Sequence, residues 1–232
     1  MPQRRSLICL LLVVLVALIF VTSPAVADDK SKDEATLSNA SAVLQAMLND
    51  KSIPSSVLSK ADCIIILPGV KKFAVGIGGS GGRGPMSCRQ GKNYTGKWSA
   101  PAMYSIGGAS AGLQLGGSST DFVLLVMAPA AVDKVLSGKT KVGSDMTAAA
   151  GPSGATSTGS MGGADILTYG RAKGLFAGIS LSGATLDPDN DANKRLYGQA
   201  VSVRDIVVTD TVKPTPAGQG LVSQLNQLRK AK

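Results

Sequence analysis

Histidine is absent from the sequence, which removes the side chain that most often acts as a general base or binds zinc. Ser-His and Cys-His nucleophile pairs are excluded for the same reason. Glutamate occurs once, at Glu34, and half of the 14 aspartates stand beside Pro, Asn, Gly or Lys. Such settings are typical of turns and helix caps rather than of paired acids in an active site. We therefore expect a protein that is not an enzyme and that holds no metal and no cofactor.

The first 27 residues have the three parts of an export signal. Arg4 and Arg5 form a basic start, residues 7–21 are an apolar run, and Ala25-Val-Ala27 supplies the small residues of a cleavage site. The run is shorter than the roughly 20 residues needed to cross a bilayer. We expect a signal peptide over residues 1–27, a mature chain that begins near Asp28, and export to the periplasm or cell envelope.

Two cysteines remain in the mature chain, Cys63 and Cys88. Export would deliver them to a compartment in which disulfides persist, so they are candidates for one bridge. Two buried thiols or a metal pair are the alternatives, and a metal pair would lack histidine and further cysteine ligands.

Acids are missing from the 58 residues between Asp62 and Asp121. Six basic residues occur there, interleaved with glycine turns: Lys71, Lys72, Arg83, Arg89, Lys92 and Lys97. Without its first 27 residues the chain has 22 basic and 15 acidic residues, so anionic partners are favoured. The pattern predicts a positively charged patch, with an ordinary solvated basic surface as the alternative.

Two short motifs resemble nucleotide-binding sequences but lack the context that those motifs need. Residues 76–81 match the glycine spacing of a dinucleotide fingerprint, yet no helix pattern follows and no acid stands about 20 residues later. Gly138-Lys-Thr140 resembles the end of a P-loop, but Asp133 stands where the first glycine is required. We interpret them as a glycine-rich strand and turn and as a helix end.

Apolar spacing along the rest of the chain changes between the periods of helices and of strands. Residues 33–50 carry apolar side chains at three- and four-residue intervals, which predicts an amphipathic helix. Further helices are expected at about 54–60, 129–136, 189–199 and near 221–228, with a linker at 213–216 and a flexible loop at 151–163. Short strands are expected at 63–67, 73–77, 85–89, 102–106, 111–115, 121–127, 166–169 and 175–181. The pattern predicts an α+β fold with a curved, mostly antiparallel sheet flanked by helices.

Several longer stretches stand in a fixed order: Ala61-Asp-Cys-Ile-Ile-Ile-Leu-Pro68, Gly96-Lys-Trp-Ser-Ala-Pro101, Gly108-Ala-Ser-Ala-Gly-Leu-Gln-Leu-Gly116, Ser119-Thr-Asp121, Ala150-Gly-Pro152 and Tyr169-Gly-Arg-Ala-Lys-Gly-Leu-Phe-Ala-Gly-Ile-Ser-Leu-Ser-Gly183. Together they resemble the SYLF domain family, known also as the actin-binding domain of yeast cortical patch proteins and as a lipid-binding domain in bacteria. The resemblance covers about residues 34–208. It implies a non-enzymatic module that binds anionic phospholipids through basic residues and an N-terminal amphipathic helix.

The helix that the resemblance assigns to membrane contact has no Lys or Arg between Asp33 and Asp50, which an interfacial helix usually has. The expected lipid contacts therefore move to the six basic residues of the acid-free segment and to Arg171 and Lys173. We expect a SYLF-like lipid-binding domain at 33–208, after a short tail at 28–32 and before a linker and terminal amphipathic helix at 209–232.

The expected partner is an anionic phospholipid or membrane surface and not a nucleic acid. The first alternative is a non-enzymatic envelope scaffold or protein-interaction domain, in which the basic patch meets an acidic protein. The second is an enzyme that uses Asp121 or Asp165 together with Arg171, which would need a deep pocket with convergent polar groups.

Overall fold

The computed structural model describes residues 24–75, 77–111, 116–151, 163–173, 181 and 183–228. Its strands are β1 (Cys63–Val75), β2 (Ile77–Cys88), β3 (Ala102–Ala111), β4 (Gly116–Val126), β5 (Thr140–Lys141), β6 (Ala148–Ala150), β7 (Ile166–Lys173) and β8 (Thr185–Pro188). They form one sheet in the order β5-β8-β3-β2-β1-β4-β7-β6. Neighbouring strands are antiparallel, apart from the parallel pair β6 and β7.

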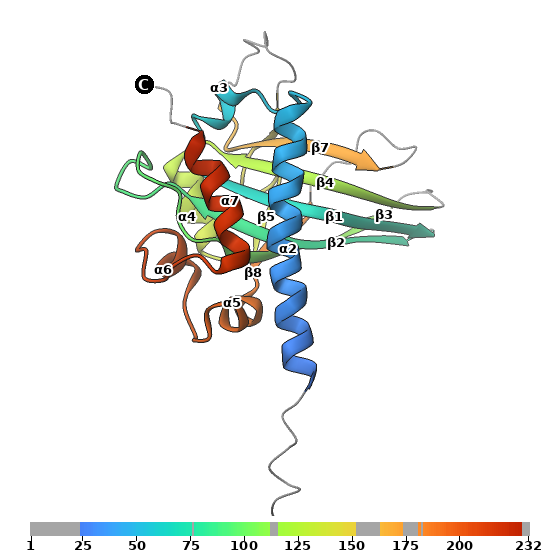
Figure 1. Ribbon diagram of the computed structural model, residues 1–232. Coiled ribbons are helices and arrows are strands. Elements are labelled where there is room, and N and C mark those ends of the chain that lie inside the picture. The colour runs from blue at the N-terminus through green and yellow to red at the C-terminus, as the bar shows by residue number, and fades with distance from the viewer. Residues whose placement is uncertain are drawn as a thin grey trace, which may run out of the picture.

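Helices flank this sheet: α2 (Pro24–Asn49), α3 (Ser55–Leu58), α4 (Pro129–Leu136), α5 (Asn190–Tyr197), α6 (Val203–Val207) and α7 (Pro216–Gln227). The sheet is curled, and α2 crosses its strands with α7 alongside (Figure 1). The predicted α+β fold with a mostly antiparallel sheet is confirmed.

Two apolar cores lie on opposite faces of the sheet, because side chains alternate along each strand. Ile64 and Ile66 of β1 pack in the core that includes residues of α2, α3 and α7. Cys63 and Ile65 pack in the core that includes residues of α4 and α6. Fully burying an isoleucine side chain stabilises the fold by about 1.5–3 kcal/mol relative to leaving it exposed. The buried strand residues therefore keep the helices packed on both faces of the sheet.

Helix α2 begins before the predicted start at residue 33 and includes residues 28–32, which were expected to form a tail. Its inner stripe is fully buried at Leu37, Ala40, Leu44 and Met47. The expected signal peptide lies outside the described residues apart from its last four positions, so its cleavage stays a prediction. Among the described helices, none is long and apolar enough to cross a membrane.

The largest difference from the expected strands concerns the glycine-rich segment after Pro68. The strand expected at 63–67 and residues 73–75 of the strand expected at 73–77 are parts of β1, whereas Ile77 begins β2. The register of β1 with β4 shifts between Leu67 and Val70. The segment 76–81, interpreted as a glycine-rich strand and turn, and the strand expected at 85–89 lie largely within one long strand, β2, which runs from Ile77 to Cys88. A Cβ atom at Gly84 would lie 1.9 Å from the Ile66 carbonyl oxygen, so glycine is required by close strand packing rather than by a turn.

The predicted helix at 129–136 is confirmed with the same bounds, and Pro129 stands in its first turn. The terminal helix α7 is capped by Thr215, whose hydroxyl accepts a hydrogen bond from Gly218 N–H. Its residues Leu221 and Leu225 are buried in the core shared with α2. The strands expected at 111–115 and 175–181 and the loop expected at 151–163 lie mostly outside the described residues.

Candidate functional site

Of the eight basic residues that were expected to bind lipid, seven lie toward one or the other end of β1, and Arg83 lies within β2 in a separate network. Cys63 begins this strand and Lys71 stands eight positions later, about 26 Å away at the rise of an extended strand. Lys92 and Lys97 are exposed in the segment between β2 and β3, which begins beside Cys88 and therefore beside Cys63. The structure thus does not unite all eight residues in one patch.

One group gathers where β1, β4 and β7 run side by side. Ser119 of β4 pairs with Lys71 on one side and with Lys173 on the other, and Asp121 pairs with Arg171. The backbones of Lys71 and Lys173 are two strands apart, or about 10 Å. We call Lys71, Arg171 and Lys173 the strand cluster. Lys72 follows Lys71 and therefore belongs to the opposite face of the sheet.

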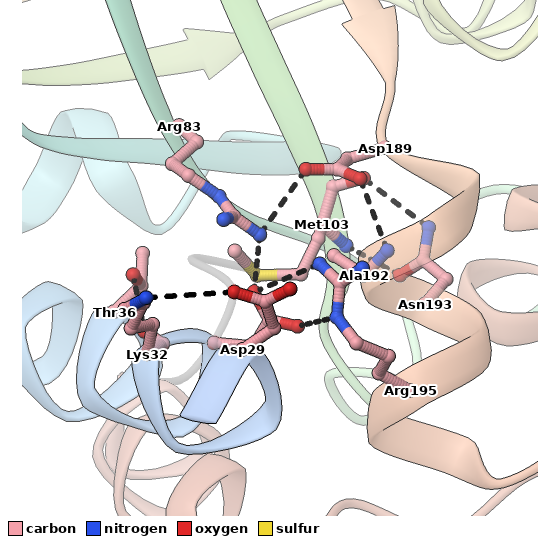
Figure 2. A network of polar contacts seen from close by, with 10 residues as sticks. Asp29, Lys32, Thr36, Arg83, Met103, Asp189, Ala192, Asn193 and Arg195 are labelled. Atoms are coloured by element: carbon pink, nitrogen blue, oxygen red, sulfur yellow. Dashed lines mark hydrogen bonds and ion pairs between the residues drawn. The ribbon is translucent and has the colours of Figure 1, made fainter. Parts of the chain in front are cut away.

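Arg83, whose side chain is partly exposed, is held by acids from two helical segments. It forms ion pairs with Asp33 of α2 and with Asp189, the latter at 3.2 Å. Arg195 of α5 binds the same Asp33 carboxylate through Nε at 2.7 Å. Figure 2 shows Arg83, Asp189 and Arg195 converging between α2 and α5. This network joins α2, β2 and α5, so Arg83 has a structural role.

Asp33 was not recognised as part of any site from the sequence, although a signal was present. It stands four residues before Leu37 and seven before Ala40, which places an acid on the buried stripe of the helix. Its side chain is fully buried, and a buried carboxylate requires cationic or hydrogen-bonding partners. Those partners come from distant parts of the chain, which no local pattern identifies.

Arg89 is also committed to internal contacts and is only 4% exposed. Its guanidinium lies 4.6 Å from the centre of the Trp98 ring and donates to the Leu228 carbonyl oxygen at 3.0 Å. Burial lowers the pKa of Arg89 from its ordinary value. These contacts attach the C-terminal end of α7 to the segment that follows β2. Lys92 and Lys97 therefore remain as the exposed members of the second group, which we call the loop pair.

Cys63 and Cys88 form a disulfide between β1 and β2. The two residues face each other in the strand register, with Cα atoms 4.0 Å apart, and both are buried in the core beneath α4 and α6. No group of three or more potential metal ligands occurs in the described part of the chain.

A pocket of about 530 Å³ lies between α2 and the strand cluster. Its lining consists of Asn39, Ala42, Val43, Ala46, Pro68, Gly69, Asp121 and Arg171. The shift in β1 forms one wall, where Gly69 has a φ of +58°, a value that favours glycine. Asp121 fixes this wall by accepting a hydrogen bond from Gly69 N–H at 2.8 Å.

The acids expected to accompany Arg171 differ in their positions. Asp165 stands at the opposite end of β7, where it accepts hydrogen bonds from the Thr147 backbone N–H and hydroxyl. Asp50, at the end of α2, lies within ion-pair range of Arg171, at 3.9 Å. Hydrogen bonds from Ser52 are the main cause that lowers the pKa of Asp50 below its ordinary value.

Comparison with known proteins agrees with the ordered motifs. The Ysc84 family model, described as "Las17-binding protein actin regulator", matches residues 107–228. SH3 domain-containing YSC84-like protein 1 of Homo sapiens is 33% identical over 172 residues, which cover 72% of this chain and 49% of the relative. LAS seventeen-binding protein 3 of Saccharomyces cerevisiae is 32% identical over 174 residues, or 72% of this chain and 37% of the relative. No solved structure matches the chain.

The chain belongs to the Ysc84 family, which is the SYLF family expected from the sequence. It spans about half or less of the length of these curated relatives. Their names describe a protein that binds Las17 and an SH3 domain-containing protein, rather than enzymes.

Proposed function

We propose that this protein is a non-enzymatic module that attaches to anionic phospholipid surfaces in the cell envelope. The observation that carries the proposal is the strand cluster, in which adjacent strands bring three basic residues close together. Lys71 and Arg171 are exposed, and β1 and β2 contribute no acid to this part of the sheet. Although Asp50 offsets part of the Arg171 charge, basic residues outnumber acids on this surface, which attracts anionic membranes without any catalytic machinery.

The expected strength of this attachment is moderate. Each basic residue near an anionic surface contributes about 1 kcal/mol. The strand cluster therefore supplies at most about 3 kcal/mol, reduced by the pairing of Arg171 with Asp50, and the loop pair about 2 kcal/mol. The attraction decays over about 8 Å at physiological salt. Attachment is therefore reversible and weakens as salt concentration rises.

Export is the second part of the proposal. The N-terminal sequence has the three parts of a signal peptide, and the buried disulfide suits an oxidising compartment outside the cytoplasm. Phosphatidylglycerol, cardiolipin or lipopolysaccharide would be the available anions in a bacterial envelope. The N-terminal sequence of protein purified from an envelope fraction tests this part, because export with cleavage predicts a start at Asp28.

Vesicle co-sedimentation tests the lipid proposal. The mature protein should sediment with phosphatidylglycerol vesicles at low salt, less at high salt, and weakly with phosphatidylcholine vesicles. The variant Lys71→Gln/Arg171→Gln/Lys173→Gln should lose most of this binding, whereas Lys92→Gln/Lys97→Gln should lose less. Equal binding to neutral vesicles, without salt dependence, would exclude electrostatic attachment.

The names of the relatives favour one alternative, a protein-interaction or scaffold domain, because one relative is named for binding another protein. A scaffold would show no preference for anionic vesicles. The same sedimentation series therefore separates the two functions.

A further inference from the structure

The pocket beside α2 combines features of a site for a single small molecule rather than for a flat membrane surface. Its volume of about 530 Å³ lies within the usual range for ligand sites. It opens on the same side of the sheet as α2 and is bordered by the strand cluster through Arg171.

Arg171 supplies the charge that a ligand would meet in this pocket. Its side chain is 46% exposed, whereas Asp121 is 2% exposed and holds Gly69 N–H with one of its oxygens. A guanidinium presents its donors as a planar fork that fits two oxygens of a phosphate or carboxylate. Arg171 is therefore suited to an oxyanion, and the exposed Asn39 adds a second polar side chain to the lining.

Asp50, which forms an ion pair with Arg171, is a weak competitor for such a ligand. Asp50 stands 3.9 Å from Arg171 and is 41% exposed. Its other oxygen accepts hydrogen bonds from the Ser52 backbone N–H and hydroxyl at 3.0 Å and 2.5 Å. An exposed pair at this distance contributes little, and a bidentate oxyanion would approach the guanidinium more closely.

The opposite wall of the pocket is apolar and is formed by short side chains. Ala42, Val43 and Ala46 occupy one side of α2, and Pro68 faces them from β1. Alanine at two positions one helical turn apart leaves space that larger residues would fill. The wall suits a short hydrocarbon segment attached to the oxyanion.

We propose that this pocket binds the head of one anionic amphiphile, a phosphate ester whose oxyanion lies on Arg171 and whose first methylene groups pack against Ala42, Val43 and Ala46. This inference rests on the proposed function, because that function makes a phospholipid the source of the oxyanion. It goes beyond that function because it requires a shaped site in addition to surface charge.

The test uses the mature protein and dihexanoylphosphatidylglycerol below its micellar concentration, measured by isothermal titration calorimetry. Ala46→Leu fills the pocket without changing charge, and Arg171→Gln removes the cation. Both should weaken binding at least tenfold. Asp50→Asn removes the competing acid and should strengthen binding about two- to threefold. Lys213→Gln removes one exposed charge outside the strand cluster and the loop pair and should leave the affinity unchanged.

Wild-type affinity in Ala46→Leu, or in Arg171→Gln, would overturn the proposal. If thermal unfolding shows that Ala46→Leu is unstable, Ala42→Leu, at an exposed position, provides a second variant that fills the pocket. Glycerol phosphate distinguishes the possible sources of the oxyanion. If it binds as tightly as the lipid, the amphiphile assignment is wrong and the pocket recognises a soluble ester.

The two proposals fail in different measurements. If Ala46→Leu still sediments with phosphatidylglycerol vesicles and binds the monomeric lipid normally, the pocket assignment fails and surface attachment survives. If the wild-type protein ignores vesicles but binds the monomeric lipid through Arg171, surface attachment fails and the pocket survives.

Discussion

The buried carboxylate of Asp33 allows a sharp test of how α2 is attached. Its side chain is fully buried, while its partners Arg83 and Arg195 are 36% and 23% exposed. The two sides of the network are therefore not equivalent. Arginines that lose Asp33 can turn toward water, whereas a carboxylate that loses both arginines stays buried without a counter-charge.

We predict that Arg83→Met/Arg195→Met destabilises the protein by about 3–5 kcal/mol, the usual cost of leaving a buried charge without its partner. Asp33→Asn keeps the side-chain volume and should cost less, about 2 kcal/mol. At about 2–4 °C per kcal/mol for a domain of this size, the double variant should lower Tm by about 6–20 °C. Urea unfolding followed by circular dichroism measures both values.

The triple variant Asp33→Leu/Arg83→Met/Arg195→Met should recover most of the loss, because no buried charge remains. Arg204→Met is the control, since its ion pair with Asp133 is exposed and should contribute less than about 1 kcal/mol. The reasoning would be refuted if Asp33→Asn were more destabilising than the double arginine variant. It would also be refuted if all these variants unfolded within about 0.5 kcal/mol of the wild type.

Three further predictions concern the two cores. Gly84→Ala should lower Tm sharply because a Cβ atom there would lie 1.9 Å from a backbone oxygen of β1. Gly81→Ala should not, because the atom nearest to a Cβ there is 3.9 Å away. Equal Tm values for the two variants would contradict this packing. Replacing Cys63 and Cys88 by serine should reduce unfolding free energy in urea by about 3 kcal/mol, and unchanged stability would argue against the bridge. Burial raises the pKa of Tyr169 to about 12, and its hydroxyl has no hydrogen-bond partner among the described residues. The native state therefore keeps this proton to a higher pH than the unfolded state does, so the free energy of unfolding should fall as pH rises from about 10 to 12. Tyr169→Phe should remove part of that fall in urea titrations at alkaline pH. An identical pH profile for the variant and the wild type would contradict the prediction.

Helices were the most predictable part of the fold because their signals are local. Pro129 and Gly138 mark the two ends of α4, and Asp189 caps α5, whose C-cap Gly198 has a φ of +70°. Each signal requires side chains only a few residues apart. The short strands of the glycine-rich segment were less predictable, since Gly and Pro favour turns in a local pattern. In β2 they are accommodated by pairing on both sides with β1 and β3.

The candidate site was predicted in its residue types but not in its arrangement. Basic residues within an acid-free segment indicate an anionic partner whatever the fold. Their partners depend on contacts far apart in the sequence, such as Asp33 with Arg195, 162 residues later. The pocket likewise depends on how α2 crosses the sheet (Figure 1), which helix periodicity alone does not define.

The separation of the strand cluster from the loop pair decides how the protein can meet a membrane. A flat bilayer contacts both groups only if β1 lies along the membrane, because its two ends are about 26 Å apart. On the α2 side, α2 and α7 cover the middle of the sheet, so the strand cluster can approach a surface without the loop pair (Figure 1). If instead both groups touched the bilayer, neutralising either should reduce vesicle binding in proportion to the charge removed. A much larger loss from the strand cluster than from the loop pair, per charge removed, would therefore identify the end of the sheet that faces the lipid.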